Sequence, residues 1–101
     1  MKIVIADKLP ASAIALLRNE GWTVKAEPAR STDQLIADLS DADALIIRSA
    51  TQVTSSLIEA APKLRAIARA GTGVDNVDVG TASEKGIVVM NAPGANSISV
   101  A

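Results

Sequence analysis

The sequence has 101 residues, enough for one domain with a single hydrophobic core. Apolar residues make up 49% of it, but Trp22 is the only aromatic, so Val, Ile, Leu and Ala must fill that core. The formal net charge is −1, with acids and bases interspersed, which argues against the basic stripe of a nucleic-acid-binding protein. Histidine and cysteine are absent, so the sequence offers no thiolate chemistry and lacks the commonest general base and metal ligand.

No targeting or membrane-spanning segment is predicted. The opening residues MKIVIAD are too short for the core of a signal peptide, and no apolar run approaches the roughly 20 residues of a membrane span. Together with the lack of cysteine, this pattern predicts a cytoplasmic globular protein with no membrane or nucleic-acid partner.

In chain order, short apolar runs alternate with helical patterns. The runs predict strands at 2–6, 22–26, 44–48, 65–69 and 87–90. The intervening segments predict a helix over 11–20 that stops at Gly21, one opened by the capping-box pair Ser31 and Gln34, one capped by Thr54 and closed before Pro62, and one over 79–85 that stops at Gly86. Residues 41–43 are predicted to form a turn.

This alternation predicts an α/β fold with a five-stranded parallel sheet and helices on both faces. The strands are apolar throughout, as expected when both faces are covered. In such sheets ligands gather beyond the carboxyl ends of the strands, near the switch point in strand order. Four polar residues fall at predicted strand ends and should share that edge: Asp7, Arg48, Arg69 and Asn91.

Two of these residues suggest a site for a small anion. Arg48 and Arg69 each follow or close an aliphatic run, and Arg is favoured for planar, bidentate recognition of carboxylate or phosphate. Each such charge-assisted bond contributes on the order of 1.5–3 kcal/mol. The competing interpretation is that each arginine is solvated or pairs with a carboxylate such as Glu59 or Asp75.

The turn Gly71-Thr72-Gly73 is a second candidate for anion binding. It is not a dinucleotide fingerprint, because Asn76 stands at the third glycine position, and it is not a phosphate loop, because no Gly-Lys-Ser/Thr follows. Consecutive N–H groups in such a turn can form an anion nest. The glycines alone are equally consistent with a sharp turn and nothing more.

Asp7 has the position of a strand-end carboxylate, which in receiver-type signalling domains can belong to a phosphorylation site. Such a site needs an acceptor at the third strand and a lysine at the fifth, whereas here those strands are followed by Arg48 and Met90-Asn91. Asp7 is therefore predicted to tether a loop.

Four segments, read together, resemble a known family. IADKL, IIRSATQVT, APKLRAIARAGTGVDNVD and KGIVVMNAPGANS, in this order and spacing, are similar to the start of the D-isomer-specific 2-hydroxyacid dehydrogenases, and within them to members that act on 3-phosphoglycerate. The resemblance covers essentially the whole chain. It implies a flavodoxin-like substrate-binding domain and an NAD-dependent oxidoreductase that converts 3-phospho-D-glycerate to 3-phosphohydroxypyruvate on the way to serine.

The resemblance also implies roles for particular residues. It assigns Thr72 to the cofactor, where the cofactor crosses the cleft between domains. It assigns no catalytic residue and no metal ligand to this chain. The residues that it assigns to the substrate are Arg48, Ser49, Arg69, Ala70, Gly71 and Asn96.

In this family the catalytic Arg, Glu and His and the glycine-rich dinucleotide loop belong to a following domain. Residues 1–101 are therefore expected to be the N-terminal part of the substrate-binding domain, with 96–101 starting the helix between domains. NAD would be bound mainly by the following domain, the full-length protein would be a homo-oligomer, and the chain alone would be inactive. Two other interpretations stay open: a relative acting on a non-phosphorylated 2-hydroxy acid, and a stand-alone anion-binding module.

Overall fold

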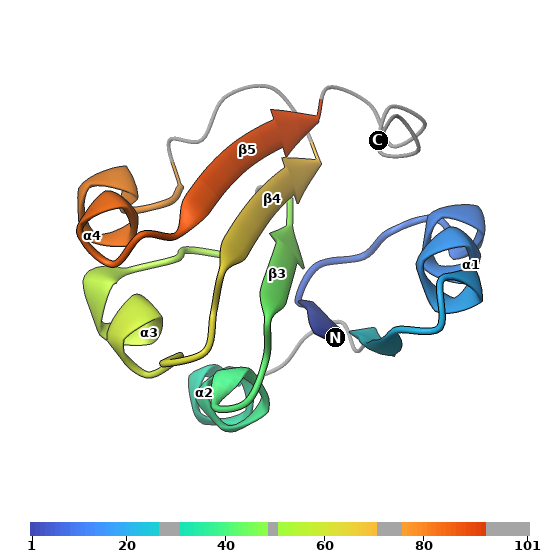
Figure 1. Cartoon of the computed structure of the whole chain (residues 1–101), viewed down its shortest axis with the longest axis horizontal. Coiled ribbons are helices and arrows are strands. Elements are labelled where there is room, and N and C mark those ends of the chain that lie inside the picture. Colours follow the sequence, from blue (N-terminus) through green and yellow to red (C-terminus); the bar gives the residue numbers. More distant parts are fainter. Residues whose placement is uncertain (27–30, 49–50, 71–75, 93–101) are drawn as a thin grey trace.

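The computed structural model describes residues 1–26, 31–48, 51–70 and 76–92. Its strands are β1 (Lys2–Ile5), β2 (Thr23–Ala26), β3 (Ala44–Ile47), β4 (Ala66–Ala70) and β5 (Val88–Ala92). Its helices are α1 (Ala11–Asn19), α2 (Thr32–Leu39), α3 (Ser55–Glu59) and α4 (Val79–Glu84). Figure 1 shows strands and helices alternating along the chain, which confirms the predicted βα repeat.

The five strands form one parallel sheet in the order β2-β1-β3-β4-β5. This is the flavodoxin-like order, in which the chain starts near the middle and winds first to one side and then to the other. The order reverses between β1 and β3, so that pair of strands marks the switch point of the sheet. The predicted fold class is confirmed.

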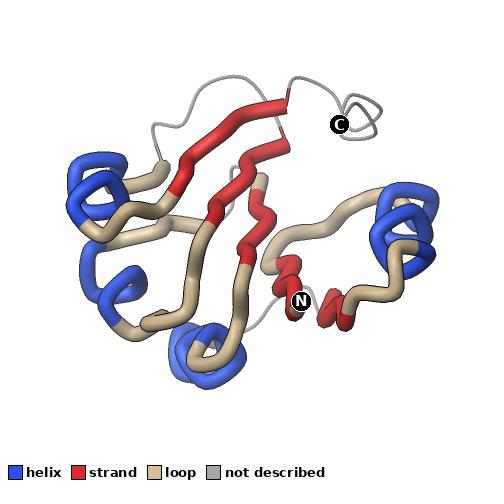
Figure 2. The backbone as a smooth tube through the Cα atoms, in the orientation of Figure 1, coloured by secondary structure: helices blue, strands red, loops and turns tan. Residues whose placement is uncertain are grey.

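Helices cover both faces of the sheet. Figures 1 and 2 show α1 on one face and α2, α3 and α4 on the other. Between α1 and the sheet lies a small core that includes Ile3, Ile5 and Ile46. The larger core lies on the other face, where Leu39 of α2 and Leu57 of α3 pack among side chains from β1, β3 and β4.

Local sequence signals fix the ends of several helices. The Ser31 hydroxyl accepts from the Gln34 N–H at 3.2 Å, and the Ser31 N–H donates to the Gln34 side chain at 3.0 Å, so the predicted capping box starts α2. Thr54 caps α3 as expected. Gly21 and Gly86 follow α1 and α4 with φ of 83° and 72°, a left-handed conformation that favours glycine.

The strands differ from their predicted limits by one or two residues: β1 and β3 end one residue earlier and β2 starts one residue later, while the last two strands shift toward their carboxyl ends. β4 continues past Arg69 to Ala70, and β5 starts at Val88 and continues to Ala92. The cause is pairing: Arg69 lies opposite Asn91 and Ala70 opposite Ala92, so the ladder extends beyond the apolar runs. Asn91 therefore lies within β5 and does not follow it.

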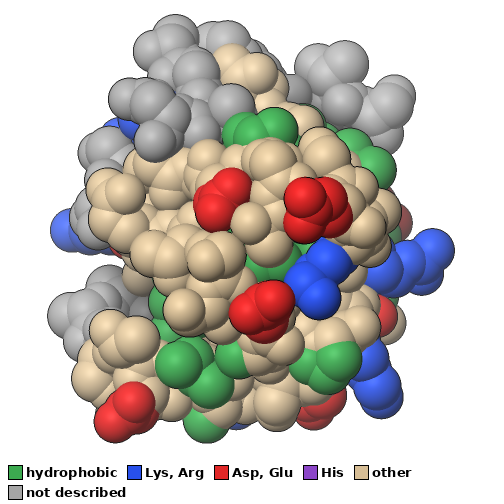
Figure 3. All heavy atoms as spheres, turned by 90° about the vertical axis from the view of Figure 1, so that its left-hand side faces the viewer, with side chains coloured by type: hydrophobic (Ala, Val, Ile, Leu, Met, Phe, Trp, Pro, Cys, Tyr) green, Lys and Arg blue, Asp and Glu red, His purple; other side chains and the backbone are tan. Residues whose placement is uncertain are grey.

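The surface is mixed in charge. Figure 3 looks at the side that carries α3 and α4 and shows acidic, basic and apolar side chains interspersed. No helix among the described residues is long and apolar enough to cross a membrane.

Candidate functional site at the carboxyl edge of the sheet

Three neighbouring strands bring the predicted polar residues to one edge. The register pairs Ile47 with Arg69 across β3 and β4, and Arg69 with Asn91 across β4 and β5. Arg48 comes one residue after Ile47. The main chain at Arg48, Arg69 and Asn91 is therefore brought together at the carboxyl edge, as the sequence predicted.

The two arginines leave the sheet on different faces. Arg69 shares its register position with Ile47, which is buried in the core beneath α2 and α3, so its side chain starts on that face. Arg48 is exposed, and its Nη1 donates to the Lys8 carbonyl, in the loop before α1, at 3.4 Å. The two side chains thus start from opposite faces of the sheet, whereas the anion-site hypothesis expects both guanidiniums to converge on one site at this edge.

Arg48 has no ion pair with a carboxylate among the described residues, so the predicted alternative partner Glu59 does not hold it. Asp75, the other carboxylate considered, lies outside the described residues. Arg69 is half-buried, and its Nε is enclosed by protein. Both side chains thus start at the carboxyl edge. The Arg48 side chain is exposed to solvent, and the Arg69 side chain is partly buried.

Asp7 is a loop tether, as predicted. One carboxylate oxygen accepts from the N–H groups of Arg48 at 2.6 Å and Thr51 at 3.2 Å. The other accepts from the Thr51 hydroxyl at 2.6 Å. The tether joins the end of β1 to the segment after β3, which places it at the switch point of the sheet.

Asn76 is a residue of this edge that the sequence analysis did not assign. Its side-chain NH2 donates to the carbonyls of Arg48 at 2.8 Å and Thr51 at 2.6 Å, and it is the one buried polar residue among those described. In the sequence it is notable only as the residue at the third glycine position of a fingerprint that does not match. The signal available was an amide side chain directly before the apolar Val77, in a chain whose other buried positions are aliphatic.

The other predicted site residues are described only in part or not at all. Ala70 ends β4, and only its main chain is described. The predicted site residues Ser49, Gly71, Thr72 and Asn96 lie outside the described residues, as does the segment 96–101. Among the described residues no group of acidic side chains is arranged to hold a metal ion.

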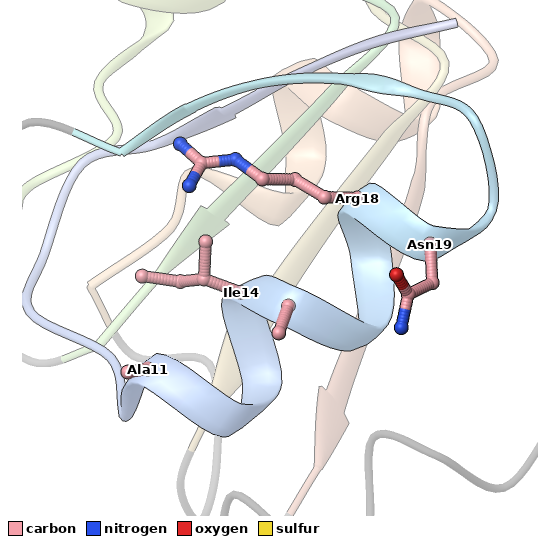
Figure 4. Close-up of a pocket in the computed structure, with 5 residues that line it drawn as sticks. Ala11, Ile14, Arg18 and Asn19 are labelled. Atoms are coloured by element: carbon pink, nitrogen blue, oxygen red, sulfur yellow. The ribbon is translucent and has the colours of Figure 1, made fainter.

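Two surface hollows are lined by neither Arg48 nor Arg69. One, of about 370 Å³, runs along α1 between Ala11, Ile14 and Arg18, as Figure 4 shows. It is lined by that helix alone. The second, of about 310 Å³, lies between the first turn of α2 and the segment that starts at Thr51, so it adjoins the tethered loop.

Comparisons with known proteins agree with the fold. The family model described as "D-isomer specific 2-hydroxyacid dehydrogenase, catalytic domain" matches residues 3–101. The chain is 48% identical to the D-3-phosphoglycerate dehydrogenase of Homo sapiens over 99% of its length, and 48% identical to that of Methanocaldococcus jannaschii over 100%. It spans 19% of the length of each of these relatives.

Solved structures give the same result. The NAD+-bound 3-phosphoglycerate dehydrogenase of Entamoeba histolytica superposes with a TM-score of 0.82 and 32% identity, covering 92% of this chain and 33% of that one. An NAD-dependent formate dehydrogenase of Staphylococcus aureus superposes with a TM-score of 0.78 and 30% identity, covering 90% and 32%. The match of the family model to nearly every residue, on a sheet of the same architecture, means that the chain belongs to the D-isomer-specific 2-hydroxyacid dehydrogenase family.

Proposed function

We propose that the chain is the N-terminal part of the substrate-binding domain of an NAD-dependent D-3-phosphoglycerate dehydrogenase. The full-length enzyme would oxidise 3-phospho-D-glycerate to 3-phosphohydroxypyruvate, a step toward serine. The observation that carries the proposal is the arrangement of Arg48 and Arg69 on neighbouring strand ends, in a chain about half identical to relatives of that name.

The arginines supply the binding chemistry. A substrate lying over the carboxyl edge would meet Arg48 from the α1 side and Arg69 from the side of α2 and α3. The substrate carries a phosphate and a carboxylate, and a guanidinium suits either group because its N–H donors match two oxygens at once. We assign further substrate contacts to Ser49, Asn96 and the main chain at 70–71.

The cofactor would be held mainly outside the described residues. Asn76 occupies the third glycine position, so the sequence 71–76 does not match the dinucleotide fingerprint. We assign Thr72 alone to the cofactor. When bound, NAD accepts the hydride that the substrate loses from C2.

This chain contributes orientation and charge neutralisation. Oxidation at C2 also requires a base for the hydroxyl proton, and the sequence contains no histidine to act as one. The residues at the carboxyl edge would fix the substrate's anionic groups and so present C2 in one orientation. We place the protein in the cytoplasm, consistent with its cysteine-free sequence, and expect a homo-oligomer at full length.

The proposal is tested in the full-length enzyme with Arg48→Ala. If Arg48 holds the phosphate, the KM for 3-phosphoglycerate should rise by roughly tenfold or more, the equivalent of at least one charge-assisted bond of about 1.5 kcal/mol. The KM for a short, non-phosphorylated 2-hydroxy acid should change little. Steady-state NADH formation measures both.

Arg65→Ala is the matched control. Arg65 is also exposed but lies directly before β4, at the opposite edge of the sheet, so its loss should leave both KM values unchanged. An equal rise for both substrates after Arg48→Ala would instead favour a relative that acts on a non-phosphorylated acid. NAD reduction by the 101-residue chain alone would contradict the assignment of this chain to substrate binding.

A further inference from the structure

We propose that Asp7 and Asn76 are positioning residues for substrate binding, which hold the main chain of Arg48 and Thr51 so that the Arg48 guanidinium is fixed where the substrate's anion meets it. This inference rests on the proposed function, because it acts through the role given to Arg48. We call Asp7, Arg48, Thr51 and Asn76 the strand-end network.

Asp7 binds the main-chain N–H groups of the network. Its carboxylate accepts from the main-chain N–H groups of Arg48 and Thr51 and from the Thr51 hydroxyl, at 2.6, 3.2 and 2.6 Å. Bonds to an ionised acceptor are shorter and about twice as strong as neutral ones. Three donors on one carboxylate therefore fix the position of this main chain relative to the end of β1.

Asn76 binds the main-chain carbonyls of the network. Its NH2 group donates to the Arg48 and Thr51 carbonyls, the same two residues whose N–H groups Asp7 accepts. Asn76 is only 9% exposed, and its main-chain carbonyl accepts from the Val53 N–H at 2.8 Å. All four main-chain polar groups of Arg48 and Thr51 thus have side-chain partners, although neither residue belongs to a strand or helix.

The network leaves the Arg48 side chain available. The Arg48 main chain is held by Asp7 and Asn76, whereas its guanidinium is exposed and makes a long contact of 3.4 Å to one carbonyl. Among the described residues no carboxylate pairs with this guanidinium, and a fixed main chain that carries an exposed binding group lowers the ordering cost of binding. Small displacements of such a group weaken orientation strongly, so a defect in the network should appear in substrate binding.

The network also links elements that are far apart in the sequence. Asp7 follows β1, Arg48 and Thr51 follow β3, and Asn76 lies between β4 and α4. The segment at Val53 pairs with Val77, which extends this contact beyond the sheet. The network therefore sets the position of the β3 end relative to both of its neighbouring strands at the switch point.

The test uses Thr51→Val in the full-length enzyme, with Thr51→Ser as its control. Valine keeps the shape of threonine but removes the hydroxyl that donates to Asp7, while serine keeps that donor. With Thr51→Val we expect the KM for 3-phosphoglycerate to rise severalfold to about tenfold, with kcat little changed. Thr51→Ser should restore a KM near that of the wild type.

A double-mutant cycle separates positioning from a merely structural role. If the network acts through Arg48, Thr51→Val should have no further effect on KM in an Arg48→Ala background. A lower thermal midpoint with an unchanged KM, or an equal effect in both backgrounds, would overturn the inference. Asp7→Asn, which keeps the size of the side chain but removes its charge, replaces Thr51→Val in the same cycle if that variant does not fold.

The cycle also distinguishes the two proposals. If Arg48→Ala leaves the KM unchanged, the proposed role of Arg48 fails and the inference fails with it. If Arg48→Ala raises the KM but neither Thr51→Val nor Asp7→Asn does, only the inference fails.

Discussion

At the scale of single residues, one polar side chain serves several main-chain groups. Asp7 and Asn76 illustrate this: each contacts two residues of the same segment, one through its acceptors and the other through its donors. Asp7 could be predicted as a tether because a carboxylate directly after a strand has nearby main-chain N–H groups to accept from. The partners of Asp7 and of Asn76 could not be predicted, because they lie 25 to 44 residues away in the sequence and only the fold brings them close.

A second residue-scale feature is the ion pair between Lys2 and Asp41 at the opposite edge of the sheet. The hydrogen bond from Lys2 holds the pKa of the Asp41 carboxyl below its ordinary value. A pKa that is lower in the folded than in the unfolded state stabilises the fold above the ordinary Asp pKa of about 3.9, and that contribution is lost as the pH falls through the lowered value.

Asp41→Asn should therefore lower the stability of the 101-residue chain slightly at pH 7. The effect is small because the pair is exposed to solvent. The difference between wild type and variant should shrink as the pH falls through the lowered pKa of the Asp41 carboxyl. Urea unfolding monitored by the fluorescence of Trp22 at several pH values measures it, and a difference that stays constant with pH would contradict the assignment.

At the scale of elements, most of the strands and helices could be predicted because their signals are local. Apolar runs predicted the strands, although β2 also contains the exposed Thr23 and Lys25, and Ser31, Thr54, Gly21 and Gly86 predicted four of the helix ends. All five strand limits are off by one or two residues, and at β4 and β5 the cause is pairing between neighbours that continues through Arg69 and Asn91 beyond the apolar residues. Strand limits of this kind depend on the partner strand and are not encoded by either strand alone.

The helices differ in how much of their surface is buried, which gives a stability prediction. Leu39 of α2 is fully buried in the larger core, whereas Leu16 of α1 is 53% exposed. Leu39→Ala should lower the free energy of unfolding by about 2–5 kcal/mol, because it removes buried methyl groups and leaves a cavity. Leu16→Ala should change it by no more than about 0.5 kcal/mol.

Urea unfolding of the two variants side by side tests this prediction, since both replace Leu by Ala within a helix and so share any change in helix propensity. Similar losses for the two variants would mean that α2 is not packed as the structure shows.

At the scale of the whole molecule, the architecture could be predicted but the geometry of the site could not. Alternating elements of this length leave a parallel sheet with helices on both faces as the favoured arrangement. The face from which each arginine leaves the sheet depends on register, and a shift of one residue reverses it. That is why the sequence placed Arg48 and Arg69 at one edge without showing that their side chains start from opposite faces of the sheet.

The edge of the sheet at β5 leads to the last prediction. Val88 and Met90 are 58% and 47% exposed and lie two residues apart, on the same side of β5. Among the described residues β5 pairs with β4 alone, so its other side presents unpaired main-chain groups next to an apolar surface. Exposed apolar edge strands are templates for pairing with a second chain.

The 101-residue chain should therefore self-associate at high concentration, and Val88→Lys should reduce this, because a charge on an edge strand disfavours strand addition. Light scattering over a dilution series measures the average mass. Leu16→Lys is the matched control: it also replaces an exposed apolar side chain with lysine, but on a helix whose main-chain groups are already paired. If both substitutions reduce association equally, general hydrophobicity drives it; a decrease with Val88→Lys alone identifies the β5 edge as the surface that pairs.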